Sequence, residues 1–150
     1  MQQSSLQLES SAITRVRIEA NKNFPQEQAK EKFNNFSESG LESVVKYGPA
    51  PHNPRLYFVK LEIKLLGTDT SQPPYLIDLE IVGTFSLPNT ELPVNETLVE
   101  CNGPAVLYGS IRELVMQITS RGPFPPIVLP TVNFVNPDTK VEPDGRLSKV

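Results

Sequence analysis

Two neighbouring segments of the chain alternate apolar and charged residues with a period of two. In Leu56–Leu66, positions 57, 59, 61, 63 and 65 are apolar, whereas positions 60, 62 and 64 are charged. Tyr75–Phe85 repeats the pattern, with apolar residues at 75, 77, 79 and 81 and acids at 78 and 80. A period of two places alternate side chains on opposite faces of a strand. With the polar linker Gly67–Pro74 between them, the segments predict an antiparallel hairpin with one charged face.

Two weaker strand signals precede this hairpin. In Ala12–Ala20, Val16 and Ile18 alternate with charged neighbours, which predicts a half-buried strand. Leu41–Tyr47 predicts a second, weaker strand. The polar stretch Pro25–Gly40 fits a short helical turn or a long connection equally well.

The hydrophobic period changes to that of a helix in the second half of the chain. Between Ser110 and Gly122, apolar residues recur at i, i+3, i+4 and i+7, at positions 111, 114, 115 and 118. Gly122 followed by proline is a typical helix stop. For the start, Asn102 is a candidate cap with Pro104 at the first helical position. Gly109 then marks a weak or kinked point.

The residues after this helix are apolar but rich in proline. Pro123–Pro130 is not helical, because prolines remove backbone donors and fix φ. An extended run of this hydrophobicity, continued by Val132 and Phe134, must lie against apolar surface. It either packs on the core of its own domain or walls a groove for an extended polypeptide or a second subunit, since large exposed apolar patches tend to mark interaction sites. Physical reasoning alone favours packing on its own core.

Together these elements predict an α+β fold, with a four-stranded antiparallel sheet packed against one long helix. We expect a flexible N-terminus over residues 1–11, one domain over residues 12–135 and a flexible tail over residues 136–150. The tail is polar and contains Pro137, Pro143 and Asp144-Gly145.

Composition narrows the class of protein. A chain of 150 residues fits a single domain. The net charge of -3, from 14 basic and 17 acidic residues, gives no electrostatic footprint for nucleic acid. No apolar run approaches the ~20 residues that span a bilayer, and Met1–Ser11 lacks the pattern of a signal peptide. We therefore expect a cytoplasmic protein that neither binds nucleic acid nor inserts into a membrane.

Candidate catalytic residues are few. His52 is the one histidine and Cys101 the one cysteine, so a thiol dyad is conceivable. A surface histidine and a buried cysteine that acts as a small hydrophobe are the favoured readings. Asn95-Glu96-Thr97 matches a glycosylation sequon, which means little without a secretion signal. With no metal-ligand spacing and no phosphate loop in the sequence, we expect no enzyme activity, no cofactor and no metal.

The acids of the predicted hairpin, Glu62, Asp78 and Glu80, lie on its charged face. Two carboxylates on a sheet support acid–base catalysis only when they are close together and tuned by burial. Here they interleave with Lys60 and Lys64, so cross-strand ion pairs are the simpler interpretation.

The stretch Leu107–Pro126 resembles the long helix of the SecB family and the loop that follows it. The matching pieces are Arg112-Glu113, Ser120-Arg121-Gly122, Phe124-Pro125 and Pro130-Thr131-Val132-Asn133-Phe134. Gly83–Leu87 is similar to the end of the family's last strand. The resemblance covers residues 12–135 and is most specific in the helix and the loop.

This resemblance implies an ATP-independent holdase, a chaperone that binds non-native polypeptides in long apolar grooves. It further implies a homotetramer built as a dimer of dimers, and delivery of preproteins to the SecA motor of the secretion translocon. The groove candidates are Phe85, Leu87, Tyr108, Phe124, Ile127, Val128, Leu129 and Phe134. On the last strand, Leu76 and Asp78 match positions where the family docks SecA.

The chain departs from the family pattern in two places. Family members usually carry a second amphipathic helix after the Asn-Phe pair, and the residues from Asn136 onward do not predict one, so the C-terminal helix is reduced or absent. The acids that the family pattern leads us to expect on the first strand are not evident, and Arg15 and Arg17 make that strand basic. An alternative is therefore a solitary SecB-like chaperone dedicated to the antitoxin of a toxin–antitoxin system. An enzyme or small-ligand binder, and a structural protein without a client, are less favoured classes.

Overall fold

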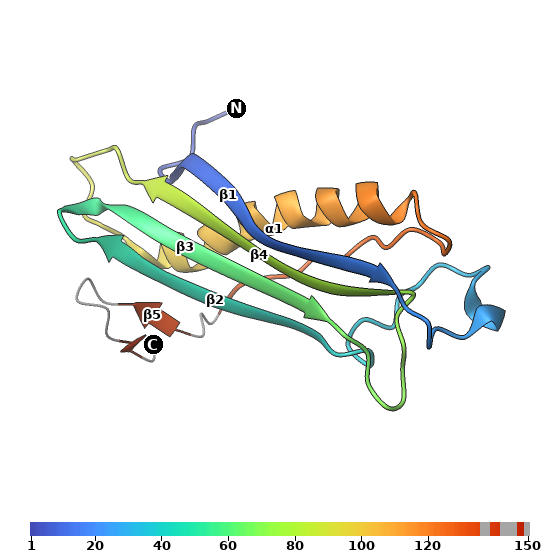
Figure 1. Cartoon of the computed structure of the whole chain (residues 1–150). Coiled ribbons are helices and arrows are strands. Elements are labelled where there is room, and N and C mark those ends of the chain that lie inside the picture. The colour runs from blue at the N-terminus through green and yellow to red at the C-terminus, as the bar shows by residue number, and fades with distance from the viewer. Residues whose placement is uncertain (136–138, 142–146, 149–150) are drawn as a thin grey trace.

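The sheet has four long antiparallel strands. The computed structural model of the chain describes residues 1–135, 139–141 and 147–148 (Figure 1). The long strands are β1 (Gln7–Ala20), β2 (Leu41–Ala50), β3 (Asn53–Leu65) and β4 (Tyr75–Ser86), and they lie in the order β1-β4-β3-β2. Two short strands, β5 (Thr139–Val141) and β6 (Leu147–Ser148), continue the sheet beyond β2. β5 runs parallel to β2.

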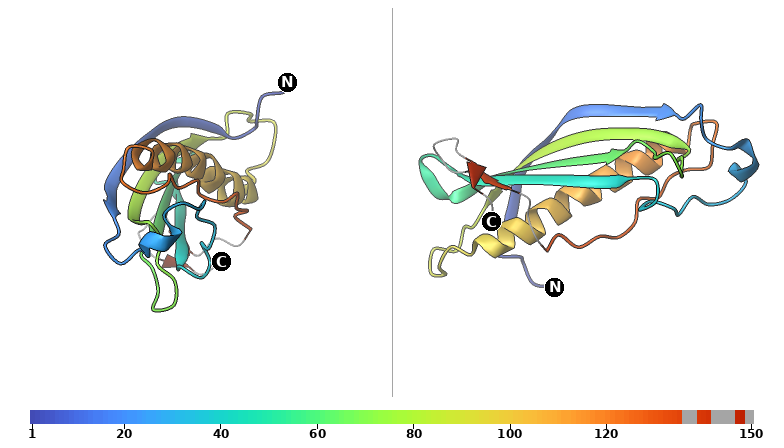
Figure 2. Two further views of the ribbon diagram at one scale, coloured as in Figure 1. Left: turned by 90° about the vertical axis from the view of Figure 1, so that its right-hand side faces the viewer. Right: turned by 90° about the horizontal axis from the view of Figure 1, so that it is seen from below.

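One helix, α1 (Glu96–Thr119), runs diagonally across one face of the sheet (Figure 2). The sheet with its helix confirms the predicted α+β fold. Residues 26–28 form a single 3-10 turn in the connection from β1 to β2, one of the two forms predicted for that stretch. None of the helices that the structure describes is long and apolar enough to cross a membrane.

The β3–β4 hairpin follows the predicted alternation along its whole length. Leu61 pairs with Ile81 and Ile63 with Leu79, and all four side chains are buried under α1. Because the alternation is unbroken in both strands, their buried apolar side chains fall on the same face. This face, which we call the inner face, forms the core together with α1.

β1 is longer than the alternation predicts and begins at Gln7, before the expected start at Ala12. Its pairing with β4 shifts register twice, between Leu8 and Ser10 and between Ile13 and Arg15. Each extra residue moves the following side chains to the opposite face. Ile13 and Val16 therefore both share the inner face with their β4 partners, although an odd and an even position should not.

The helix starts earlier than predicted. Asn102 does not cap it, and Pro104 lies inside it and is buried. The cap is Asn95, whose side-chain oxygen accepts a hydrogen bond from the Thr97 amide at 3.1 Å, with Glu96 in the first turn. Asn, with an acid directly after it, is a favoured helix start because it satisfies free amides and complements the helix dipole. The sequon is thus a capping sequence.

The end of the chain lies partly outside the described residues. A flexible tail is expected over residues 136–150. Of these, residues 136–138, 142–146 and 149–150 lie outside the described residues. The backbone of residues 139–141 and 147–148 forms β5 and β6.

Close packing of α1 on β4 depends on Gly83. A Cβ at this position would stand 2.7 Å from Cδ2 of Leu107 and 2.9 Å from Cε2 of Phe85. We expect Gly83→Ala to destabilise the fold by about 1–3 kcal/mol, since overpacking a core forces side chains and backbone apart. Gly109→Ala is the matched control. Its Cβ would meet nothing within 4 Å, and removing a helical glycine should stabilise by about 0.5–1 kcal/mol. Urea unfolding measures both, and equal effects of the two changes would contradict this packing.

Candidate functional site

The chain after α1 runs back along the helix in neither helix nor strand. We call residues 123–135 the extended segment. Three side chains of α1 form hydrogen bonds with the backbone of the extended segment. The Tyr108 hydroxyl donates to the Pro130 carbonyl at 2.8 Å, and Nε of Arg112 donates to the Leu129 carbonyl at 3.0 Å. Oγ1 of Thr119 accepts a hydrogen bond from the Ile127 amide at 2.9 Å. These bonds set the position of the segment along the helix.

The turn between α1 and the extended segment is closed by Tyr75 of β4. Its hydroxyl accepts from the Phe124 amide at 2.9 Å and lies within hydrogen-bonding distance of the Phe124 and Thr119 carbonyls. A Cβ on Gly122 would stand 2.3 Å from this hydroxyl, so the turn requires glycine there. The Phe124 ring packs edge-on against Tyr75 and against Phe24.

Burial alternates along the extended segment. Ile127 and Leu129 are 0% exposed, whereas Val128 between them is 40% exposed. Further on, Val132 and Phe134 are half-buried and pack against the edge of the core. The segment therefore closes the core of its own subunit with one side and presents some apolar surface with the other.

The structure separates the eight groove candidates into two sets. Phe85, Leu87, Tyr108, Ile127 and Leu129 are buried in the core of their own subunit. Val128 is exposed, and Phe124 and Phe134 are half-buried. The rings of Tyr108 and Phe134 pack edge-on with centroids 5.8 Å apart, whereas Phe124 packs instead at the turn after α1. The candidates therefore do not form one continuous open surface.

An apolar pocket lies where the extended segment passes the start of β2. We call it the β2 pocket; its volume is about 130 Å³. Its lining residues come from β2, β3, α1 and the extended segment: Leu41, Glu42, Ser43, Ile63, Tyr108, Val132, Asn133 and Phe134.

Ser43 explains why this space is open. It pairs with Ile63 across the β2–β3 ladder, so it lies on the inner face. Its small side chain leaves room beside Ile63 that a larger apolar residue would fill. Leu41 and Ile63 were not among the sequence candidates. Both lie on inner-face positions of their strands, but only the strand register brings them together with Phe134.

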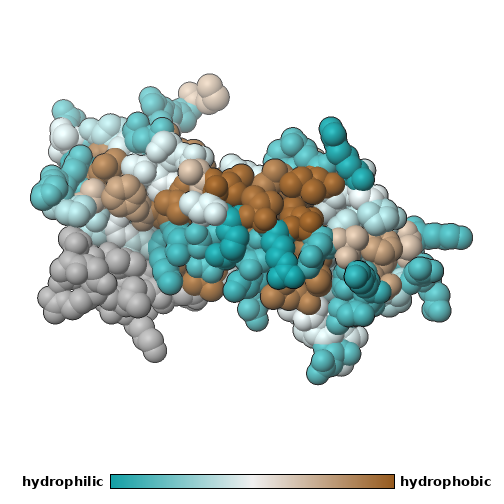
Figure 3. All heavy atoms as spheres, viewed as in Figure 1, coloured by the Kyte–Doolittle hydropathy of each residue, from teal (hydrophilic) through white to brown (hydrophobic). Residues whose placement is uncertain are grey.

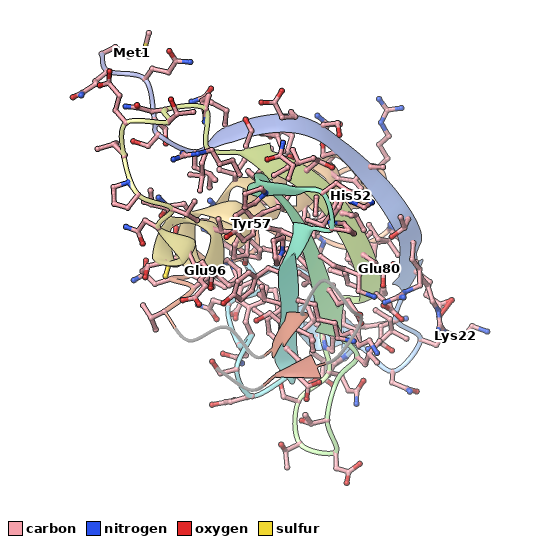
Figure 4. The ribbon with its side chains drawn as sticks, turned by 90° about the vertical axis from the view of Figure 1, so that its left-hand side faces the viewer. Met1, Lys22, His52, Tyr57, Glu80 and Glu96 are labelled. Carbon is pink, nitrogen blue, oxygen red and sulfur yellow. The ribbon has the colours of Figure 1, made fainter. Side chains whose placement is uncertain are left out.

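The N-terminal half of α1 is tied to the sheet by two tyrosine–glutamate pairs. The Tyr47 hydroxyl donates to Glu100, and the Tyr57 hydroxyl donates to Glu96 at 3.3 Å. Burial and the nearby carboxylate raise the pKa of Tyr57 to about 12, so the hydroxyl stays protonated and remains a donor. In Figure 4 Tyr57 and Glu96 lie near each other, with Glu80 away from them.

The opposite, outer face of the sheet carries an ion-pair network. Arg15 of β1 contacts Asp78 at 2.8 Å, Glu80 at 3.3 Å and Glu62 at 3.5 Å. Lys60 contacts Glu62 of its own strand at 3.4 Å and Glu80 of β4 at 3.2 Å; the second contact confirms the cross-strand ion pair predicted for Lys60. In Figure 3, hydrophilic residues gather over the middle of this face, below a hydrophobic band.

The network has an electrostatic consequence for the acids of the outer face. A hydrogen bond from Thr14, followed by the charges of Lys60 and Arg15, lowers the pKa of Glu80. Its ionised form therefore contributes to stability at neutral pH, and this contribution is lost as the pH falls through the lowered pKa. Asp78, one of the two residues matched to SecA docking, is paired to Arg15 of its own subunit. Leu76 is half-buried on the same strand.

The two residues of the conceivable thiol dyad lie on different elements. His52 is exposed in the turn between β2 and β3, and Cys101 is half-buried on α1.

Comparisons with known proteins agree on one family. The chain matches the model described as preprotein translocase subunit SecB over residues 17–136. The protein-export protein SecB of Anaplasma phagocytophilum is 28% identical over 82 residues, which are 53% of this chain and 52% of that protein. Its counterpart in Anaplasma marginale (strain Florida) is 32% identical over 81 residues, which are 53% of this chain and 46% of that protein. The chain thus spans about half the length of these curated relatives.

A solved structure has a similar fold. It is a SecB-like chaperone of Mycobacterium tuberculosis in complex with a ChAD peptide from an antitoxin. The TM-score is 0.58 at 20% sequence identity, covering 85% of this chain and 87% of that chain.

The bond between Thr119 and the Ile127 amide provides a test of how the extended segment is held. Thr119→Val keeps the shape of the side chain but leaves a buried amide without its acceptor, which should cost about 1–3 kcal/mol. Hydrogen exchange at the Ile127 amide should become faster. Ser120→Ala is the control, because the hydroxyl of Ser120 is exposed and bonds only to Gln117 of its own helix. Unchanged exchange at Ile127 in Thr119→Val would show that the segment is held in another way.

Proposed function

Since the chain belongs to the SecB family, we propose that it is a chaperone that holds non-native polypeptides unfolded without using ATP. The observation that carries this proposal is the β2 pocket, an open apolar space at the end of the extended segment. Burial of apolar side chains is non-directional and needs no nucleotide, which suits a protein that binds unfolded chains of different sequence. The proposed location is the cytoplasm, where such chains are made.

The β2 pocket has the size of one apolar side chain. A cavity of about 150 Å³ can hold a benzene molecule, so the 130 Å³ here admits a single Leu-sized or Phe-sized group. Fully burying one such side chain contributes about 1.5–3 kcal/mol. Because a dissociation constant of about 1 mM already needs 4.1 kcal/mol, one pocket alone does not hold a chain. Several linked pockets in an assembly would raise the affinity through effective concentration.

The other edge of the sheet offers a surface for such an assembly. β1 is 42%, 44% and 49% exposed at Leu8, Ile13 and Val16, although these side chains lie on the inner face. Ile118 of α1 is 39% exposed. An exposed apolar edge strand favours pairing with another chain. We assign this surface to a second copy of the chain, as part of a homotetramer built as a dimer of dimers.

Clients of two kinds are compatible with this function. One is a range of preproteins passed on to SecA; the other is one dedicated antitoxin. The Arg15–Asp78 pair favours the second, because Arg15 neutralises acids on the face where the family resemblance places SecA docking. The similar mycobacterial chaperone was solved with an antitoxin peptide, which supports the same reading. Titration of the protein with purified SecA distinguishes the two kinds of client. Tight binding of SecA that is lost in Asp78→Asn would favour delivery of preproteins to SecA.

A pair of adjacent residues tests the β2 pocket. We expect Phe134→Ser to weaken suppression of aggregation of an unfolded test protein without nucleotide, because Phe134 lines the pocket. Val135→Ser is the matched control, since Val135 is 70% exposed and is not part of the lining. Light scattering measures the amount of chaperone needed for half suppression, and circular dichroism checks that both variants fold. Equal activity of the two variants would remove the pocket from the mechanism, and an inactive wild type would refute the chaperone function.

Substitutions at the groove candidates Ile127 and Leu129 cannot test client binding. Both are 0% exposed, so a charge at either position should unfold the subunit rather than report on client binding.

A second pair of variants tests the β1 surface. Val16→Glu places a charge in the proposed contact and should lower the mass of the assembly measured by light scattering. Ser10→Glu is the control, because Ser10 pairs with Thr84 of β4, which lies on the outer face of the sheet. A wild type that is already monomeric, or a Val16→Glu protein of unchanged mass, would rule out this surface as the subunit contact.

A further inference from the structure

The edge of the sheet at β2 already holds an extended peptide segment, supplied by the chain itself. β5 pairs with β2 in parallel, with Thr139 opposite Lys46 and Lys140 opposite Tyr47. The β2 pocket lies a few residues earlier on the same strand, beside positions 41 to 43. Pocket and β5 therefore follow one another along a single strand edge.

The pocket and the β5 pairing lie close together along β2. Phe134 lines the pocket beside the start of β2, and Thr139 pairs with Lys46, three residues beyond Ser43. A strand rises about 3.3 Å per residue, so a short extended segment of a client is long enough to occupy both places together.

From this arrangement we infer that β2 is a strand-addition site for a foreign polypeptide, and that β5 is an internal ligand that competes for it. This inference rests on the proposed chaperone function and specifies how a client binds. The client is an extended segment, parallel to β2, that places one apolar side chain in the β2 pocket and pairs its backbone with β2 where β5 lies.

Strand addition supplies binding energy in addition to that of the pocket, which alone is too weak to hold a chain. Backbone hydrogen bonds to a sheet edge are independent of the client's sequence, while the pocket selects an apolar residue at one position. Within the described residues the β5 contact is small, because two residue pairs join it to β2. It is therefore suited to be displaced, and while in place it protects an edge that would otherwise favour aggregation.

A reversible crosslink tests this competition. In a Cys101→Ser background, Lys46→Cys and Thr139→Cys place two cysteines at paired positions of neighbouring strands. Such strands are about 4.7–4.9 Å apart, within the Cα separation that a disulfide accepts. Binding is measured by fluorescence anisotropy with labelled, reduced and carboxymethylated lactalbumin, a permanently unfolded chain. The staple control carries Ser10→Cys and Thr84→Cys in the same background, which join β1 to β4 at paired positions away from β2.

We expect the oxidised β2–β5 staple to weaken binding of the labelled chain at least about tenfold, because the competent state is no longer populated. Reduction should restore binding, and the β1–β4 staple should have no effect. A protein ending at residue 135 should bind at least as tightly as the full chain. If the oxidised and reduced β2–β5 forms bind equally well, strand addition at β2 is wrong and the chaperone function stands. If the unmodified protein does not bind the labelled chain, the proposed function itself fails.

Discussion

The structure depends on how a proline-rich chain without strand partners satisfies its backbone. The extended segment carries its own amides and carbonyls across an apolar core, where an unpaired polar group is costly. Side chains of α1 and β4 take the place of a neighbouring strand: Tyr108, Arg112, Thr119 and Tyr75 each bond to its backbone. The shape of the turn follows from the same constraint, because the Tyr75 hydroxyl leaves no room for a Cβ on Gly122.

Held in this way, the segment divides its apolar residues between two uses. Ile127 and Leu129 complete the core, and Val132 and Phe134 reach a place where the core is incomplete because β2 carries Ser43. A larger apolar residue at position 43 would close the β2 pocket. At this edge of the sheet the open apolar surface is therefore made by a single small residue, next to a segment that is not free to collapse into the space.

Some features were predictable from the sequence because they depend on local periodicity alone. The β3–β4 hairpin and the second half of α1 keep their periods unbroken. The start of β1, residues 7–11, was missed because it is mostly polar and a bulge after Leu8 interrupts its alternation. The helix start was missed because Pro104 outweighed the capping sequence at Asn95. The site was harder to predict. Which face of the extended segment turns inward depends on bonds from α1, and the meeting of Leu41, Ser43 and Phe134 depends on strand register.

The two edges of the sheet are protected in different ways, and under the proposed function they serve different partners. β1 is a 14-residue strand with exposed apolar side chains and a charged outer face, suited to a large and lasting contact. β2 is covered by a strand of three residues that, within the described part of the chain, pairs with it at two positions, a contact that costs little to break. A chaperone needs one surface that stays assembled and another that opens for its client. In the proposed function the unequal protection of β1 and β2 meets both needs on one sheet, on opposite sides of the hairpin that forms its core.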